Sequence, residues 1–116
     1  MTQVYLTQCA TFTASHGHGG TLAESSHLHT FAYEVTFHGP LNTEGYLIDF
    51  RVLQDFLARK ITHRLNGSAL NTLFECPTTE ALAIWIFDTV RRQFPSVCSV
   101  KVAEDQDRWI TYMGEQ

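Results

Sequence analysis

The stretch Leu28-His-Thr-Phe-Ala-Tyr-Glu-Val-Thr-Phe37 alternates between bulky apolar side chains and smaller or polar ones. Aromatic and branched residues occupy the odd positions from Phe31 to Phe37, and an alanine, a glutamate and a threonine occupy the even positions. A period of two is typical of a strand with one buried and one exposed face. The stretch therefore predicts a strand over residues 28–37 whose odd positions face the core.

The same period occurs on the N-terminal side of this strand. Between Val4 and Phe12 most even positions are apolar, which predicts another half-buried strand. His16-Gly-His-Gly-Gly20 and the polar Glu24-Ser-Ser26 interrupt the alternation and predict a loop. If the two strands pair as a hairpin, the strand ends that border this loop lie side by side.

On the C-terminal side the sequence predicts two helices. His38-Gly-Pro40 ends the strand, and after a short extended piece Asp49 is placed to cap a helix that runs to about Arg59. Pro77-Thr-Thr-Glu80 begins a second helix, because proline needs no N–H there, threonine can cap, and glutamate complements the helix dipole. An apolar stripe at helical spacing continues from Leu82 to Val90.

Two further alternating segments, residues 97–104 and 109–113, predict the last strands. The element order ββααββ is typical of an α+β domain in which two helices cover one face of a four-stranded antiparallel sheet. We expect large apolar residues on the other face, together with open sheet edges. Such surfaces usually mark assembly, so we expect a homo-oligomer.

Length and composition exclude several classes of protein. The 116 residues, 44% of them hydrophobic, suit a single domain over residues 1–116. A net charge of −4 with only 8 lysines and arginines gives no basic patch for nucleic acid. There is no long apolar segment for a membrane and no secretory leader, and three cysteines do not suggest a disulfide framework, so we expect a soluble cytoplasmic protein.

Histidine is the unusual component, with 6 in the chain. His27 and His29 share one face of the predicted strand, because residues two apart in a strand point the same way, and together they can bind one metal ion. His16 completes a three-nitrogen site if the strands pair, and such a site leaves a position open, as in catalytic zinc centres. The alternatives are that these are solvated loop histidines, or that His18 supplies a ligand instead.

Two other side chains are candidates for chemistry. Glu104 shares the apolar face of its strand with Val100 and Val102, where a carboxylate needs a partner. It either reaches water at the strand end or accepts two N–H donors from a heterocycle. His63, in a polar segment between the helices, is either solvated or a general acid or base.

Five motifs occur in order along nearly the whole chain: Phe12-Thr-Ala-Ser-His16, His27-Leu-His29, Gly45-Tyr-Leu-Ile-Asp-Phe50, Pro77-Thr-Thr-Glu80, and Glu104 with Tyr112 eight residues later. Together they resemble the Phe-x-Ala-Ala-His, His-Gly-His, Gly-x-x-x-Asp-Phe, Pro-Thr-x-Glu and Glu…Tyr motifs of the 6-pyruvoyl/6-carboxy-tetrahydropterin synthase family. The joint occurrence makes the resemblance specific.

The resemblance implies a tunnelling fold, in which ββααββ subunits form barrels and then a hexamer as a dimer of trimers, with active sites at subunit interfaces. It implies that His16, His27 and His29 bind zinc. It also implies that Glu104 anchors a pterin substrate and that Thr78 and Thr79 lie near the pterin ring.

The chain departs from the family pattern at three positions: Ala23 replaces the catalytic cysteine, Thr62 replaces the aspartate before His63, and Asp105 replaces a threonine. Glu24-Ser-Ser-His27 resembles instead a subgroup with glutamate three residues before the histidine pair, which cleaves dihydroneopterin triphosphate to 6-hydroxymethyl-dihydropterin.

The leading hypothesis is therefore a zinc-dependent lyase with Glu24 as base and His63 as the second candidate. The alternatives are a 6-carboxy- or 6-pyruvoyl-tetrahydropterin synthase and a pterin-binding relative without catalysis.

Overall fold

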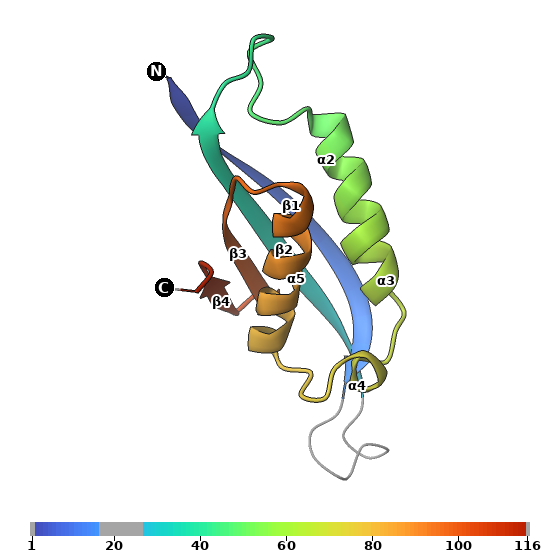
Figure 1. The fold of residues 1–116 in the computed structure, drawn as a ribbon. Coiled ribbons are helices and arrows are strands. Elements are labelled where there is room, and N and C mark those ends of the chain that lie inside the picture. Colours follow the sequence, from blue (N-terminus) through green and yellow to red (C-terminus); the bar gives the residue numbers. More distant parts are fainter. Residues whose placement is uncertain (1, 17–26, 116) are drawn as a thin grey trace.

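The structure is a computed structural model that describes residues 2–16 and 27–115, and of His16 and His27 it describes only the backbone. Four strands form one antiparallel sheet in the order β1-β2-β3-β4 (Figure 1). Their bounds are Gln3–His16 for β1, His27–Pro40 for β2, Val97–Glu104 for β3 and Arg108–Tyr112 for β4. The predicted strands and their order are confirmed, and β1 and β2 are longer than predicted.

The first helical segment is also longer than the sequence predicted. Helix α2 (Phe50–Leu57) continues through a π-helical stretch, η1 (Ala58–Thr62), into α3 (His63–Leu65). The Asp49 cap is confirmed, because the Arg51 N–H donates to its Oδ1 at 2.9 Å. His63 belongs to a helix and not to a loop, and Leu47 and Ile48 form bends where an extended piece was expected.

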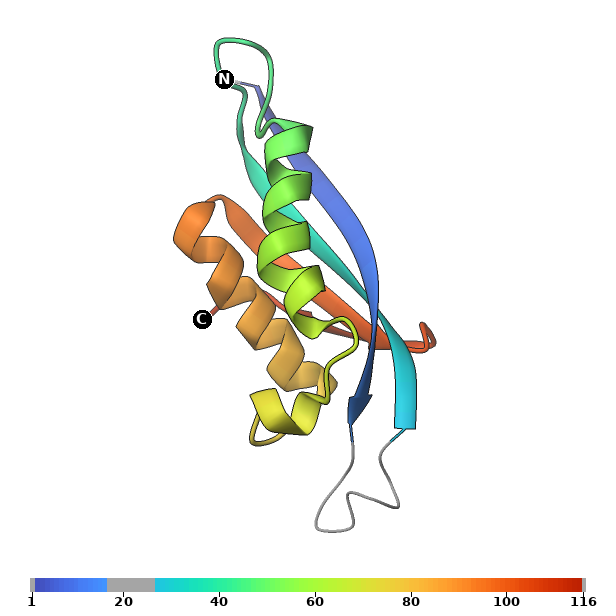
Figure 2. The ribbon, with the colours of Figure 1, turned by 90° about the vertical axis from the view of Figure 1, so that its right-hand side faces the viewer.

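The second predicted helix is α5 (Thr79–Gln93), preceded by a short α4 (Leu70–Leu73) that the sequence pattern did not indicate. Thr78 caps α5, since its Oγ1 accepts from the Ala81 N–H at 3.0 Å. Turning the molecule shows that α5 and the α2–α3 helix lie on the same face of the sheet (Figure 2). Within the described residues, none of the helices is long and apolar enough to cross a bilayer.

The core lies between that face and the helices. The odd positions of β2 point into it, as predicted, and Phe31, Tyr33, Val35 and Phe37 are at most 1% exposed. Burial of these large apolar side chains is the main force that holds helices to sheet. Their buried partners from the helices and β3 include Leu53, Phe56, Leu57, Ile61, Leu65, Leu82, Ile86, Val90, Val100 and Val102.

The opposite face of the sheet differs from expectation. Three large apolar side chains, Tyr5, Leu28 and Trp109, are exposed on this face. Most of its other positions carry threonine or charged residues. Threonine suits a strand without requiring burial, so this face can meet water. The expectation of large apolar residues on this face therefore holds at these three positions, whereas the rest of the face is largely polar. Its polar strand positions include Thr7, Thr11, Thr13, Thr30, Glu34, Thr36, Lys101 and Thr111.

Cys9 and Cys76 are exposed and Cys98 is half-buried, and all three cysteines are free thiols. Their odd number, without metal-type spacing, had not suggested a disulfide framework.

One buried hydrogen bond ties the sheet to the helix at Thr62, the position that departs from the family's aspartate. The Tyr33 and Thr62 hydroxyl oxygens lie 2.9 Å apart, and burial raises the pKa of the Tyr33 hydroxyl above its ordinary value. The Thr62 hydroxyl therefore has a structural partner. A tyrosine side chain that is 0% exposed needs such a partner for its O–H.

We expect Tyr33→Phe to lower the free energy of unfolding by about 1 kcal/mol, because it removes a part-buried hydrogen bond. Urea unfolding measures this change. Thr7→Val, which removes an exposed hydroxyl pair with Thr36 at 2.8 Å, is the control and should change stability by less than about 0.5 kcal/mol. Equal changes in the free energy of unfolding for the two substitutions would show that the Tyr33 hydrogen bond stabilises the fold no more than an exposed one does.

Candidate active site

The hairpin of β1 and β2 brings the predicted histidine positions to one end of the sheet. His16 pairs with His27, and Ala14 pairs with His29. Directly opposite residues of an antiparallel pair share a face, as do residues two apart in a strand. Positions 16, 27 and 29 therefore lie on the helix-covered face, and the predicted pairing of the strands is confirmed.

His29 is the one of these histidines whose side chain the structure describes. It is 15% exposed, and its ring lies edge-on to Phe31 with centroids 6.3 Å apart. Its Nδ1 lies 3.0 Å from Asp105 Oδ2 and 3.8 Å from Glu104 Oε2. One imidazole and two carboxylates thus form a compact group whose candidate ligand atoms all lie within 4.8 Å of one another.

Strand pairing explains why Glu104 reaches the histidine end of the sheet. Phe31 lies opposite Glu104 in the β2–β3 ladder, so Glu104 shares the helix-covered face with Phe31 and His29. As predicted, Glu104 follows the buried Val100 and Val102 on that face. Its side chain is 31% exposed, so its carboxylate lies at the border between core and solvent.

The turn between β3 and β4 holds Asp105. Asp105 and Gln106 have φ angles of 59° and 65°, in the left-handed region that aspartate tolerates better than most residues. The Asp105 N–H also donates to the Thr30 carbonyl at 3.1 Å, which fixes the turn against β2 next to His29. The backbone therefore holds the Asp105 carboxylate beside the imidazole.

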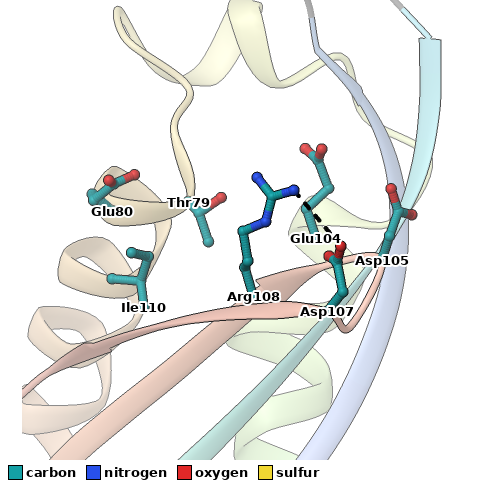
Figure 3. A pocket seen from close by; sticks show the side chains of 7 residues that line it. All are labelled: Thr79, Glu80, Glu104, Asp105, Asp107, Arg108 and Ile110. Carbon is teal, nitrogen blue, oxygen red and sulfur yellow. Dashed lines mark ion pairs between the residues drawn. The ribbon is translucent and has the colours of Figure 1, made fainter.

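A cleft of about 370 Å³ opens beside this group, between the start of α5 and the β3–β4 turn. Figure 3 shows the Arg108 side chain extending across it between Thr79 and Glu104. Arg108 lies 3.9 Å from Asp107, and carboxylates outnumber cations in the wall, so the cleft favours a ligand that offers N–H donors. The lining residues are Thr79, Glu80, Glu104, Asp105, Asp107, Arg108 and Ile110.

Not every predicted site residue meets in this cleft. Thr79 lines it with Glu104, whereas Thr78 and His63 are not among its lining residues, and the Thr78 hydroxyl oxygen caps α5. His63 is exposed on α3. Glu24, the predicted base, and His18, the alternative ligand, lie outside the described residues.

The segment that follows α3, residues 66–68, contacts β1 close to the histidine end of the hairpin. Asn66 Oδ1 accepts from the Thr13 N–H at 2.9 Å, and the Ser15 N–H donates to the Ser68 carbonyl at 3.0 Å. Gly67, with φ 77°, makes the turn that this contact needs. The segment thereby covers the edge of β1 just before His16.

Sequence reasoning did not identify Asp105, Asp107 and Arg108, because an Asp-Gln-Asp run reads as a polar turn. The available signal was position. An acidic residue directly after a candidate substrate-binding glutamate, at a hairpin turn, lies at the same end of the sheet as that glutamate. Pairing of β3 with β2 then decides which neighbour it meets.

Within the described residues, the site thus places His29 beside two carboxylates and a carboxylate-lined cleft at one end of an α+β sheet, an arrangement that can accept the N–H donors of a small nitrogen heterocycle. The family model described as 6-pyruvoyl tetrahydropterin synthase matches residues 5–115. The chain belongs to this family, and it is a lyase-type enzyme of pterin metabolism.

Two curated relatives are similar in sequence. One is the dihydroneopterin monophosphate aldolase of Pyrococcus furiosus, 34% identical over 95 residues that cover 79% of each chain. The other is a putative 6-carboxy-5,6,7,8-tetrahydropterin synthase of Archaeoglobus fulgidus, 30% identical over 83 residues that cover 72% of this chain and 71% of the relative.

Solved structures confirm the tunnelling fold. The 6-pyruvoyl tetrahydropterin synthase of Caenorhabditis elegans superposes with a TM-score of 0.85 at 20% identity, covering 99% of this chain and 98% of the other. A Plasmodium vivax 6-pyruvoyltetrahydropterin synthase, solved as a mutant in which a catalytic glutamate is replaced by alanine, gives a TM-score of 0.80 at 16% identity over the full length of both chains.

Proposed function

We propose that this enzyme is a zinc-dependent lyase that cleaves the side chain of 7,8-dihydroneopterin triphosphate or a related phosphorylated dihydropterin, leaving 6-hydroxymethyl-dihydropterin. The observation that carries the proposal is the 3.8 Å approach of Glu104 to His29, since it would place a carboxylate that binds the pterin beside a histidine that binds the metal. The aldolase name of the Pyrococcus furiosus relative supports the same reaction class.

The residues that would hold zinc are His16, His27 and His29. Their donor set fits the metal, because zinc accepts imidazole nitrogen and three protein ligands are the pattern of a catalytic site. The β1–β2 register and the carboxylate beside the His29 ring both agree with this use. When bound, zinc supplies a Lewis acid that stabilises negative charge developing on the substrate's side-chain oxygens.

Glu104 would bind the pterin ring, with Thr79 beside it in the cleft. The amino-pyrimidinone edge of a pterin offers two parallel N–H donors, which a carboxylate accepts with both oxygens. Thr78, one residue before Thr79, would act near the ring mainly by holding the start of α5. A ring held there would lie close enough to His29 for its side chain at C6 to reach the proposed metal site.

Glu24 would be the general base, with His63 as the second candidate. The base takes the proton of the hydroxyl on C2′, and a C2′ carbonyl forms as the C1′–C2′ bond breaks. The electron pair of that bond forms a C1′=C6 double bond, and the π pair of the C6=N5 bond moves onto N5. C1′ then takes up a proton, so the products are 6-hydroxymethyl-dihydropterin and a two-carbon aldehyde that keeps the phosphate. Chain geometry supports Glu24, because three residues span at most about 11 Å from His27.

The second candidate function is a 6-carboxy- or 6-pyruvoyl-tetrahydropterin synthase, which the name of the Archaeoglobus fulgidus relative favours. Ala23 favours the aldolase reaction, because it replaces the cysteine of those synthases. Incubating the zinc-loaded protein with dihydroneopterin mono- and triphosphate and separating products by chromatography tests both. Formation of 6-hydroxymethyl-dihydropterin supports the proposal, a tetrahydropterin product supports the synthase, and tight binding without any product indicates a non-catalytic pterin-binding protein.

We expect Glu104→Gln to lower kcat/KM by about 100-fold, because an amide loses the charge and one acceptor toward the ring. The measurement is steady-state turnover together with pterin binding by fluorescence. Glu44→Gln, in the loop between β2 and α2, is the matched control and should leave both values unchanged. An unaltered pterin affinity in Glu104→Gln would show that the ring binds elsewhere.

We also propose that the protein assembles as a homo-oligomer, a hexamer built as a dimer of trimers, and that it works in the cytoplasm. The edges of the described sheet, at β4 and at β1 outside residues 13–15, support assembly. Sedimentation at several protein concentrations measures the assembly.

A further inference from the structure

We propose that Asp105 is a positioning residue for the metal ligand His29, an inference that rests on the proposed metal site. Its carboxylate holds the His29 imidazole in the tautomer that presents Nε2 to the metal. Asp105 stands where the family has threonine, so this site would have an acidic partner for His29 that the family motif does not specify.

The geometry of the contact carries the proposal. His29 Nδ1 lies 3.0 Å from Asp105 Oδ2, a normal hydrogen-bond length. An ionised carboxylate only accepts hydrogen bonds, so Nδ1 carries the proton and donates. In the neutral ring the second nitrogen, Nε2, then carries the lone pair that a metal ion requires. A metal-binding histidine that donates its other N–H to a carboxylate is a recurring arrangement, and its loss typically weakens metal binding about 10- to 100-fold.

The backbone around Asp105 is built to keep this contact. The Asp105 N–H donates to the Thr30 carbonyl at 3.1 Å, and Thr30 is the residue directly after His29. Strand β2 therefore holds both the imidazole of His29 and the backbone of the residue whose carboxylate orients it. The left-handed φ of 59° turns the chain at this point.

Direct coordination by Asp105 fits the distances less well. Nδ1 and Oδ2 are 3.0 Å apart. If a metal ion lay about 2.0–2.1 Å from both atoms, the Nδ1–metal–Oδ2 angle would be about 95°, which is narrower than the tetrahedral angle that zinc prefers. A proton between the two atoms needs no such compression. Positioning is therefore the better assignment for Asp105.

The test compares Asp105→Asn with Asp107→Asn in the full-length protein. Asparagine also tolerates a left-handed φ, so Asp105→Asn keeps the turn while it removes the charge that holds the tautomer. Asp107→Asn removes a charge from the same turn, where the carboxylate faces Arg108 at 3.9 Å and not the imidazole. The two variants therefore change net charge equally and differ in the contact with His29.

The readouts are zinc affinity, from competition with a chelator, and the His29 tautomer of the metal-free protein, from imidazole nitrogen shifts in NMR. We expect Asp105→Asn to bind zinc about 10- to 100-fold more weakly and to lose the pure Nδ1–H tautomer. The zinc affinity of Asp107→Asn should stay within about threefold of the wild-type value, because solvent and salt screen an exposed charge.

Two results would overturn the inference. One is an unchanged zinc affinity and tautomer in Asp105→Asn. The other is a complete loss of zinc like that of a ligand variant, which would make Asp105 a ligand. Failure of the proposed function is a separate result, since it would appear as absence of zinc binding in the wild-type protein itself.

Discussion

Replacing His27 with alanine is expected to remove zinc from the protein and abolish turnover. Two remaining imidazoles supply too little binding free energy, and loss of one of three protein ligands should weaken zinc by at least about 100-fold. The measurements are metal content by elemental analysis after gel filtration, zinc affinity by competition, and product formation. Restored turnover at high zinc concentration would further connect activity to the metal.

His38→Ala is the matched control for this experiment. His38 belongs to the same strand β2 but stacks on Tyr5 with ring centroids 4.3 Å apart, and its even position places it on the outer face of the sheet. It should keep wild-type zinc and turnover. Full zinc content and full activity in His27→Ala would remove the three-histidine site from the proposal.

Replacing Glu24 with glutamine is expected to lower kcat by about 100- to 10,000-fold while zinc content stays at the wild-type level. The amide cannot accept a proton, and loss of a positioned general base typically costs that factor. Zinc affinity should persist because glutamine replaces a group that is not proposed as a ligand. Single-turnover kinetics with a dihydroneopterin phosphate measures the chemical step directly.

Glu75→Gln serves as the control, since Glu75 is exposed and is not among the residues that line the cleft. The same kinetics on His63→Ala decides between the two candidate bases. Wild-type kcat in Glu24→Gln combined with a large loss in His63→Ala would transfer the role of base to His63. Wild-type kcat in both variants would contradict the proposed acid–base chemistry.

The position of Thr62 shows why the catalytic details were harder to predict than the fold. Sequence comparison indicated a missing aspartate before His63, but not that the threonine hydroxyl lies 2.9 Å from Tyr33. The π-helical turn at residues 58–62 adds to this difficulty. It changes the direction of the side chains that follow, and periodicity read at 3.6 residues per turn does not reveal it.

The sequence by itself determined the element order, the strand faces, the caps at Asp49 and Thr78, and the family. These features are local: alternation with a period of two, a side-chain oxygen one residue before a helix, and motifs in fixed order are all written in neighbouring residues.

The tertiary structure alone decided that Asp105 meets His29, residues 76 positions apart in the sequence. It also decided that Glu104 and Thr79, which the family resemblance had only implied to lie near one ring, line one cleft. These results depend on strand register and on the packing of α5 against the sheet. The free energy of both comes from contacts between distant segments, which no local pattern contains.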